Sequence, residues 1–232
     1  MSGDAGQEFA FRSVLAVFAH PDDESFGLGA VLSTFAGLGI ETQGLCFTHG
    51  EASTLGATEI ELTVVRAAEL TAAAAVLGVR SLRLLSYPDG ALSTVTLEEL
   101  SSEVEASAAL DPIDCFLTFD DGGITGHPDH QRATEAALVA GDRLGVPVLA
   151  WCLPSSIAVA LNDEFGTSFV GREPCEIYLE IEVNRTLQHV AISCHASQST
   201  DNPVLWRRLA LQGTVDSLRR LTGPQGGSTG SV

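Results

Sequence analysis

Short apolar segments alternate along the chain with longer segments whose apolar residues recur at helical spacing. The short segments, which we interpret as buried strands, cover residues 13–19, 42–48, 81–85, 113–119 and 146–152. The longer ones predict helices over residues 24–38, 59–77 and 97–109 and a further helix that ends at residue 144. This alternation is typical of a parallel sheet between two layers of helices. We therefore predict an α/β fold, Rossmann-like, with a mostly parallel sheet and helices on both faces.

The last third of the chain has a different pattern. Residues 176–183 alternate between polar and apolar side chains, which predicts a half-exposed edge or antiparallel strand. Residues 185–195 and 203–221 have helical spacing, and residues 223–232 are rich in glycine and serine. We find neither an internal repeat nor a linker. A single domain is expected over residues 1–222, followed by a disordered tail at 223–232.

Composition and charge exclude several classes of protein. Hydrophobic residues make up 45% and charged residues 18%, a balance typical of folded domains rather than disordered chains. The formal net charge of −18 repels phosphate backbones, so we expect no nucleic-acid partner. All 12 basic residues are arginine. The chain therefore has no lysine for a Schiff base, a Walker-type phosphate loop or a Ser–Lys dyad.

The cysteines and the N-terminus bear on the compartment. Five cysteines occur singly, and Cys46, Cys115 and Cys152 lie within expected strands, which favours buried thiols in a reducing compartment. The first residues are acidic, unlike those of a signal peptide, and no apolar stretch is long enough to span a membrane. We expect a cytoplasmic protein that does not bind a membrane.

Four of the six histidines lie in segments that directly follow expected strands. In an open parallel sheet, the loops at the carboxyl ends of the strands form the ligand site. These segments are His20-Pro21-Asp22-Asp23-Glu24, Thr48-His49-Gly50-Glu51, Asp89-Gly90 and His127-Pro128-Asp129-His130. The topology is therefore expected to bring imidazoles and carboxylates together.

Two histidines and a carboxylate leave one coordination position open, as in hydrolytic zinc sites. Such a metal lowers the pKa of its water to about 7. A further carboxylate can then accept a proton, and a further histidine can stabilise an oxyanion or protonate an amine. A single His-Pro-Asp segment is more often only a capped helix start. Two of them, each after a strand, favour a metal site, although spacing alone does not distinguish Asp22 from Asp23 as the ligand.

These segments resemble the PIG-L/LmbE-type family of metal-dependent deacetylases. The similarity includes both His-Pro-Asp motifs and runs from about Val14 to Gln198. Its other parts are Thr48-His49-Gly50-Glu51, similar to a T-x-G-E loop, Arg66-Ala67-Ala68-Glu69-Leu70, similar to an R-x-x-E-L helix, Tyr87-Pro88-Asp89-Gly90, and His195-Ala196-Ser197-Gln198, similar to an H-x-S-Q segment.

The resemblance implies a role for each of nine residues. His20, Asp23 and His130 would bind zinc, although a site of this kind also accepts Fe(II) or another divalent metal. Asp22 would be the general base. His127 would stabilise the oxyanion and protonate the amine, with Asp129 tuning it from behind. Arg66, Asp89 and His195 would bind substrate.

The resemblance also implies removal of an acetyl group from a small amino sugar of the N-acetylglucosamine type. Two alternatives stay open: cleavage of a larger acyl group from an amino sugar conjugate, and a noncatalytic metal- or sugar-binding relative. A dinucleotide-binding oxidoreductase is disfavoured because Leu32 stands where the third glycine after Gly27 and Gly29 is required. We interpret His189 as an ordinary helix residue, leave the role of His49 open, and expect that the chain can form homo-oligomers.

Overall fold

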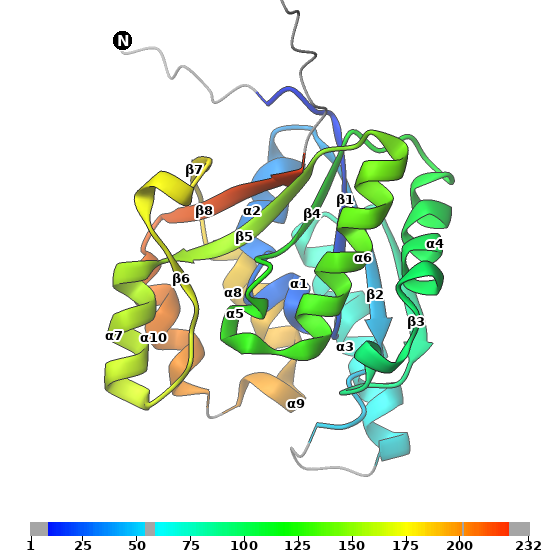
Figure 1. Ribbon diagram of the computed structural model, residues 1–232. Coiled ribbons are helices and arrows are strands. Elements are labelled where there is room, and N and C mark those ends of the chain that lie inside the picture. The colour runs from blue at the N-terminus through cyan, green and yellow to red at the C-terminus, as the bar shows by residue number, and fades with distance from the viewer. Residues whose placement is uncertain (1–8, 54–58, 201, 223–232) are drawn as a thin grey trace, which may run out of the picture.

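The computed structural model describes residues 9–53, 59–200 and 202–222 (Figure 1). Within these residues, an eight-stranded sheet has the order β3-β2-β1-β4-β5-β8-β7, and β6 pairs with the end of β5. The strands are β1 (Ser13–Phe18), β2 (Glu41–Thr48), β3 (Ser81–Tyr87), β4 (Cys115–Phe119), β5 (Val148–Pro154), β6 (Gly171–Arg172), β7 (Leu179–Glu182) and β8 (Val215–Thr222). Strands β1 to β5 are parallel, whereas β8 is antiparallel to both of its neighbours.

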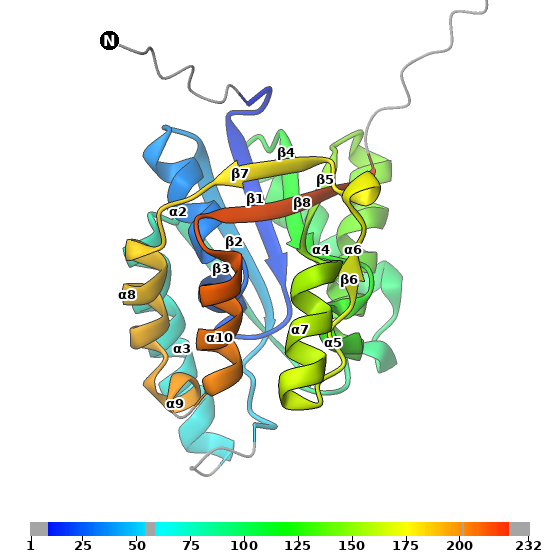
Figure 2. The same cartoon turned by 90° about the vertical axis from the view of Figure 1, so that its left-hand side faces the viewer.

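Helices cover both faces of this sheet (Figures 1 and 2). They are α1 (Asp23–Phe26), α2 (Gly29–Gly37), α3 (Glu59–Leu77), α4 (Leu97–Ala108), α5 (Gly123–Gly126), α6 (Pro128–Leu144), α7 (Ser155–Phe165), α8 (Thr186–Cys194), α9 (Ala196–Ser199) and α10 (Pro203–Gln212), with 3₁₀ turns at Leu92–Thr94 and Pro174–Glu176. Helices α4 and α6 pack on one face, and α2, α3 and α8 pack on the other. Within the described residues, no helix has the length and apolarity that a membrane span requires.

The central strand β1 shows why its sequence is apolar throughout. Val14, Ala16 and Phe18 belong to the core on the α2 and α3 side, whereas Leu15 and Val17 belong to the core on the α4 and α6 side. All five side chains are at most 1% exposed. A strand that is buried on both faces needs apolar residues at every position, so the alternation of a half-exposed strand is absent here.

The strand order creates a crevice at the carboxyl ends of the central strands β1 and β4. The chain passes from β1 to β2 on one side, while β4 pairs with β1 on the other side. The loops that follow β1 and β4 therefore diverge to opposite faces and leave space between them, as in other open α/β sheets. Both His-Pro-Asp segments begin at this point.

The predicted fold class is confirmed, because the sheet is mostly parallel and helices cover both faces. The edge strand predicted over residues 176–183 is β7, antiparallel to β8, and Cys46, Cys115 and Cys152 are buried. The domain boundary at residue 222 stays a prediction. The predicted tail at 223–232 lies outside the described residues.

The helix predicted over residues 24–38 is wrong in one respect, because it is two helices, α1 and α2. The chain turns at Gly27 and Leu28, where the backbone N–H groups of both residues donate to the carbonyl oxygen of Asp23, at 3.1 and 3.2 Å. A Cβ atom on Gly27 would lie 2.3 Å from the Phe119 ring. Close packing of α1 against β4 therefore requires glycine here, and apolar spacing alone cannot show such a break.

The helix predicted over residues 203–221 is confirmed only as far as Gln212, and its second half is wrong. Helix α10 ends at Gln212, and the chain returns as β8, which fills the place between β5 and β7. Pairing with two strands stabilises this segment as a strand although its arginines and leucines are good helix formers. Helix α7, which follows β5 directly, was not predicted.

Candidate metal centre

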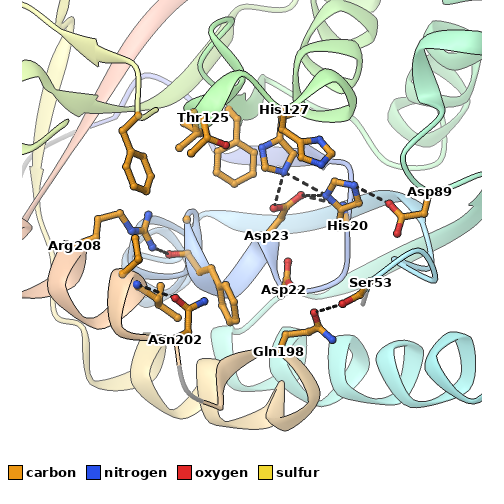
Figure 3. Close-up of a pocket in the computed structure, with 18 of the residues that line it drawn as sticks. His20, Asp22, Asp23, Ser53, Asp89, Thr125, His127, Gln198, Asn202 and Arg208 are labelled. Atoms are coloured by element: carbon orange, nitrogen blue, oxygen red, sulfur yellow. Dashed lines mark hydrogen bonds and ion pairs between the residues drawn. The ribbon is translucent and has the colours of Figure 1, made fainter. Parts of the chain in front are cut away.

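A cavity of about 660 Å³ opens between the carboxyl ends of β1 and β4 (Figure 3). One end is lined by histidines and carboxylates from the loops after β1, β3 and β4. The other end is lined by aromatic side chains and by residues of α10. The titratable residues in this lining are His20, Asp22, Asp23, Asp89, His127 and His130, together with Arg66 and Arg208.

Three side chains in this cavity direct ligand atoms at one point. His20 Nδ1 lies 3.3 Å from His130 Nε2 and 3.6 Å from Asp23 Oδ2, and His130 Nε2 lies 3.1 Å from Asp23 Oδ1. Ligand atoms at tetrahedral zinc–nitrogen and zinc–oxygen bond lengths lie about 3.4 Å from one another. The three atoms therefore have the spacing of a tetrahedral divalent-metal site in which the fourth position is open to the cavity.

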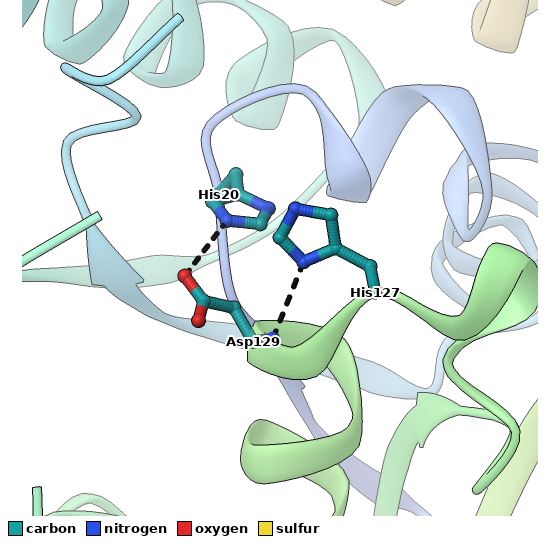
Figure 4. Close-up of side chains that lie close together, drawn as sticks. All are labelled: His20, His127 and Asp129. Atoms are coloured by element: carbon teal, nitrogen blue, oxygen red, sulfur yellow. Dashed lines mark hydrogen bonds and ion pairs between the residues drawn. The ribbon is translucent and has the colours of Figure 1, made fainter. Parts of the chain in front are cut away.

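The tautomer of His20 supports this interpretation. Its Nε2 atom lies 3.0 Å from Asp89 Oδ1 (Figure 3) and 3.4 Å from Asp129 Oδ2 (Figure 4). Because ionised carboxylates only accept hydrogen bonds, Nε2 carries the proton and Nδ1 presents its lone pair. A metal-binding histidine commonly donates its second ring N–H to a carboxylate in this way.

Asp23 is poised as the anionic ligand. Its Oδ2 atom accepts hydrogen bonds from the backbone N–H groups of Ala19 and His20, at 3.2 and 2.9 Å. Burial alone would raise the pKa of Asp23, but the nearby His130 and His20 outweigh burial and lower this pKa well below its usual value. One carboxylate and two imidazoles thus form a donor set that suits a divalent metal.

Asp22 lies beside this centre with a strained backbone. Its φ angle of 112° is in the left-handed region, which a residue with a Cβ atom rarely adopts. Four hydrogen bonds fix the conformation. The Asp22 N–H donates to Glu24 Oε2 at 3.0 Å, its carbonyl oxygen accepts the N–H groups of Ser25 and Phe26, and Arg66 Nη2 donates to its carboxylate at 2.8 Å. Burial raises the pKa of Asp22 to about 7, although Arg66 opposes the shift.

Arg66 extends from α3 into the floor of the site and is 3% exposed. Besides the Asp22 carboxylate, its guanidinium contacts the carbonyl oxygens of Pro21 and Gly50. Gly50 has a φ angle of +65°, and a Cβ atom there would lie 2.0 Å from Arg66 Nη1. Only glycine leaves room for this arginine. The guanidinium that the resemblance assigns to substrate binding is thus already engaged with the loop that carries Asp22.

His195, at the end of α8, is completely buried and does not line the cavity. Its Nε2 atom lies 2.5 Å from Glu24 Oε1, and the other oxygen of Glu24 accepts the Asp22 N–H. Burial alone would lower the pKa of His195, but Glu24 raises it. His195 therefore reaches the site only through Glu24, rather than by the direct substrate contact that the resemblance implies.

His127 is the N-cap of α6, and its Nδ1 atom accepts the backbone N–H of Asp129 at 3.2 Å. Its proton is consequently on Nε2. Burial and the neighbouring His130 and His20 lower the pKa of His127, which favours the neutral ring. The carboxylate of Asp129 contacts His20, not His127 as the resemblance implies, and it also accepts the N–H groups of Gly90 and Leu92.

The structure also places residues outside the predicted set. His49 contacts Ser86 on β3, and His189 lies edge-on to Trp206 on the outer side of α8 and α10. The Phe119 ring stacks on His130 with 5.0 Å between ring centroids. The sequence did not indicate this contact of Phe119 with His130. It did not indicate Arg208 either, because residues 203–221 have an ordinary helical pattern.

Comparisons with known proteins show the family of this chain. The sequence profile of the PIG-L family, described as GlcNAc-PI de-N-acetylase, matches residues 15–140, just over half of the chain. A 1D-myo-inositol 2-acetamido-2-deoxy-alpha-D-glucopyranoside deacetylase of Salinispora arenicola is 28% identical over 84% of this chain and 79% of its own length. The enzyme of the same name from Kineococcus radiotolerans is 30% identical over 56% of this chain, but the match spans only 46% of that enzyme.

Solved structures share the fold at low sequence identity. The N,N'-diacetylchitobiose deacetylase of Pyrococcus horikoshii superposes with a TM-score of 0.68 at 20% identity, over 91% of this chain and 84% of that one. The 4-carboxy-2-hydroxymuconate hydratase GalB of Pseudomonas putida superposes with a TM-score of 0.70 at 17% identity, over 91% and 97%. The fold thus also occurs in an enzyme that is not a deacetylase. On the family profile, which includes both strands that carry the site, the chain belongs to the PIG-L family.

Proposed function

We propose that the protein is a metal-dependent hydrolase that removes the acetyl group from a small amino sugar of the N-acetylglucosamine type. The observation that carries this proposal is the convergence of His20, Asp23 and His130 beside Asp22 in one cavity. Membership of the PIG-L family and the deacetylase names of its relatives support the same reaction.

Zinc is the metal that we propose for His20, Asp23 and His130. A bound divalent cation of this kind acts as a Lewis acid and lowers the pKa of water. Nitrogen and oxygen donors at tetrahedral spacing suit zinc, and Fe(II) is the alternative that the same donors accept.

Asp22 is the group that we propose as general base. Its carboxylate lines the cavity next to Asp23, and the strained backbone together with Arg66 fixes its direction. It accepts a proton from the attacking water, and that proton is then available for the departing amine. A positioned base of this kind contributes about 10²–10⁴-fold to the rate.

His127 is the group that we propose opposite the developing charge. Because its Nδ1 atom accepts the Asp129 N–H, its Nε2–H is free to donate to the oxyanion of the tetrahedral intermediate. The neutral ring carries only this one proton, so in our proposal the departing nitrogen takes the proton that Asp22 received from water, rather than one from His127 as the resemblance implies. Preorganisation of this donor by a backbone N–H avoids the cost of orienting the ring during the reaction.

In our proposal the remaining predicted residues position the metal ligand His20 and the base Asp22. Asp89 and Asp129 orient His20, Arg66 orients Asp22, and His195 acts through Glu24. Asp89 and Arg66 also line the cavity, so sugar hydroxyls remain a proposed second contact for both.

The test combines metal analysis with acid release from a panel of N-acetylglucosaminides and of glucosaminides with longer N-acyl groups. We expect about one zinc per chain. Asp22→Asn should retain the metal but lose about 10²–10⁴-fold in kcat, whereas Asp163→Asn, an exposed acid on α7, should match the unmodified protein. Release of only larger acyl groups would favour the amidase alternative. Bound metal with no product from any amide would leave a binding role.

A further inference from the structure

Arg208 lies in the same cavity at the end opposite the metal centre. In Figure 3 it lies with Asn202 on one side of the cavity, while His20 and Asp89 lie on the other side. The residue is 5% exposed. Its guanidinium lies over the Trp151 ring, 4.9 Å from the centroid, and donates a hydrogen bond to the Phe26 carbonyl. These contacts from α10 to β5 and α1 fix its position.

This guanidinium has no anionic partner in the described part of the chain. Arg66, the other buried arginine there, pairs with Asp22. By its charge alone the carboxylate of Asp216 would raise the pKa of Arg208, but this carboxylate is itself bound by Arg185 and Gln212. Burial lowers the pKa of Arg208 to about 10, so it stays charged at neutral pH. A buried and unpaired charge is costly, and such a cost is commonly offset by a ligand.

The surroundings of Arg208 favour binding of an anion. Phe26, Phe169 and Trp151 are among the aromatic residues that line the cavity, and Trp151 lies directly against the guanidinium. The low dielectric of such surroundings strengthens the attraction between opposite charges. Asn202 uses its side-chain oxygen to cap α10, accepting the Leu205 N–H at 3.0 Å. Within the described residues its amide N–H₂ has no acceptor, so we take it as a second donor on the same side of the cavity.

We propose that Arg208 binds a carboxylate on the part of the substrate that lies away from the acetamido group, with Asn202 as a second donor. The substrate class is then an N-acetyl amino sugar whose aglycone carries a negative charge. One guanidinium balances one carboxylate, and its planar donors match the two oxygens. This inference rests on the proposed function, which places the acetamido group at the metal centre.

The experiment compares two matched glycosides, one with a carboxylate on the aglycone and one with the corresponding primary amide. With the zinc-loaded protein, we expect kcat/KM to favour the carboxylate by about 10–100-fold, the range of one charge-assisted hydrogen-bond pair. Arg208→Gln should bring this ratio close to 1, and Arg208→Lys should leave an intermediate ratio. Arg207→Gln, which removes the exposed neighbour that pairs with Glu164, should leave the ratio unchanged.

Several outcomes would overturn the inference. A wild-type ratio near 1, or an equal loss for both glycosides in Arg208→Gln, would mean that Arg208 has only a structural role. If Arg208→Gln does not fold, the wild-type ratio and Arg208→Lys decide. Acetate from neither glycoside would contradict the proposed function, and calorimetric binding of the carboxylate glycoside over the amide would still test Arg208 directly.

Discussion

Asp89 and Asp129 both contact His20 Nε2, yet the structure predicts different consequences when each is changed to asparagine. Asp89 is the nearer partner, at 3.0 Å against 3.4 Å, and in the described part of the chain its other oxygen accepts only the exposed Ala52 N–H, at 2.8 Å. Asp129 has a completely buried side chain and accepts two further hydrogen bonds, from Gly90 at 2.7 Å and Leu92 at 3.1 Å. The partners of Asp129 are all N–H donors. The asparagine amide of Asp129→Asn has only one acceptor oxygen, so its N–H₂ group must face at least one of these donors.

The magnitudes follow from this mismatch. A buried donor left without an acceptor costs about 1–3 kcal/mol, and we expect Asp129→Asn to lower the free energy of unfolding of the metal-free protein by this amount. Loss of a carboxylate behind a metal-binding histidine lowers metal affinity by about 10–100-fold. Since Asp89 is nearer to His20, Asp89→Asn should lie toward the upper end of that range and Asp129→Asn toward the lower end. The two variants should therefore rank in opposite orders for metal affinity and for stability.

The assay is zinc affinity by competition with a chelator, measured together with urea unfolding of the metal-free protein. Asp142→Asn, an exposed acid on the same helix as Asp129, is the control and should change neither quantity. Equal zinc affinity in the unmodified protein and both variants would refute the reasoning. It would mean that these carboxylates do not orient a metal ligand, or that His20 binds no metal.

Two further predictions concern a buried ion pair after β4 and a support of Asp22. Asp120, buried directly after β4, pairs with Arg172 and Arg219 at 2.6 and 2.5 Å. Burial alone would raise the pKa of Asp120, but the two arginines lower it below its ordinary value of 3.8. The ion pairs therefore stabilise the folded protein fully above pH 3.8, and this stabilisation is lost as the pH falls through the lowered pKa of Asp120. Asp120→Asn should cost about 3 kcal/mol of unfolding free energy at neutral pH. This cost, measured by urea unfolding, should shrink in acid. Glu24→Gln should lower kcat at least tenfold with unchanged zinc content, because it removes one acceptor from the contacts that fix the strained Asp22; unchanged kcat would contradict this role.

The sequence predicted the parts of the fold in which local and tertiary preferences agree. Strands β1, β4 and β5 are apolar because both of their faces are buried. Four histidines follow strands of the sheet, so the sheet and the place of the site could be predicted from pattern. The break at Gly27 and the strand β8 did not follow. The break depends on the Phe119 ring and the strand on pairing with β5 and β7, which are contacts between segments distant in the sequence.

The candidate site divides in the same way. The residue types at strand ends indicated a metal centre, and the resemblance supplied the roles of Asp22 and Asp23. Neither the residue types nor the resemblance predicted which side chains the supporting residues contact. The contacts of Asp129 with His20 and of His195 with Glu24 depend on side-chain directions. Arg208 had no sequence signal, because only the cavity distinguishes it from the neighbouring exposed Arg207.

The supports form two separate groups, and this separation has a functional consequence. The proposed metal ligand His20 is oriented by Asp89 after β3 and by Asp129 on α6. The proposed base Asp22 is fixed from the other face of the sheet, by Arg66 on α3 and through Glu24 by a histidine after α8. Changes in the first group should therefore act on metal affinity, and changes in the second on kcat at full metal occupancy. A single shared support would couple the two quantities, whereas this arrangement allows each to be altered alone.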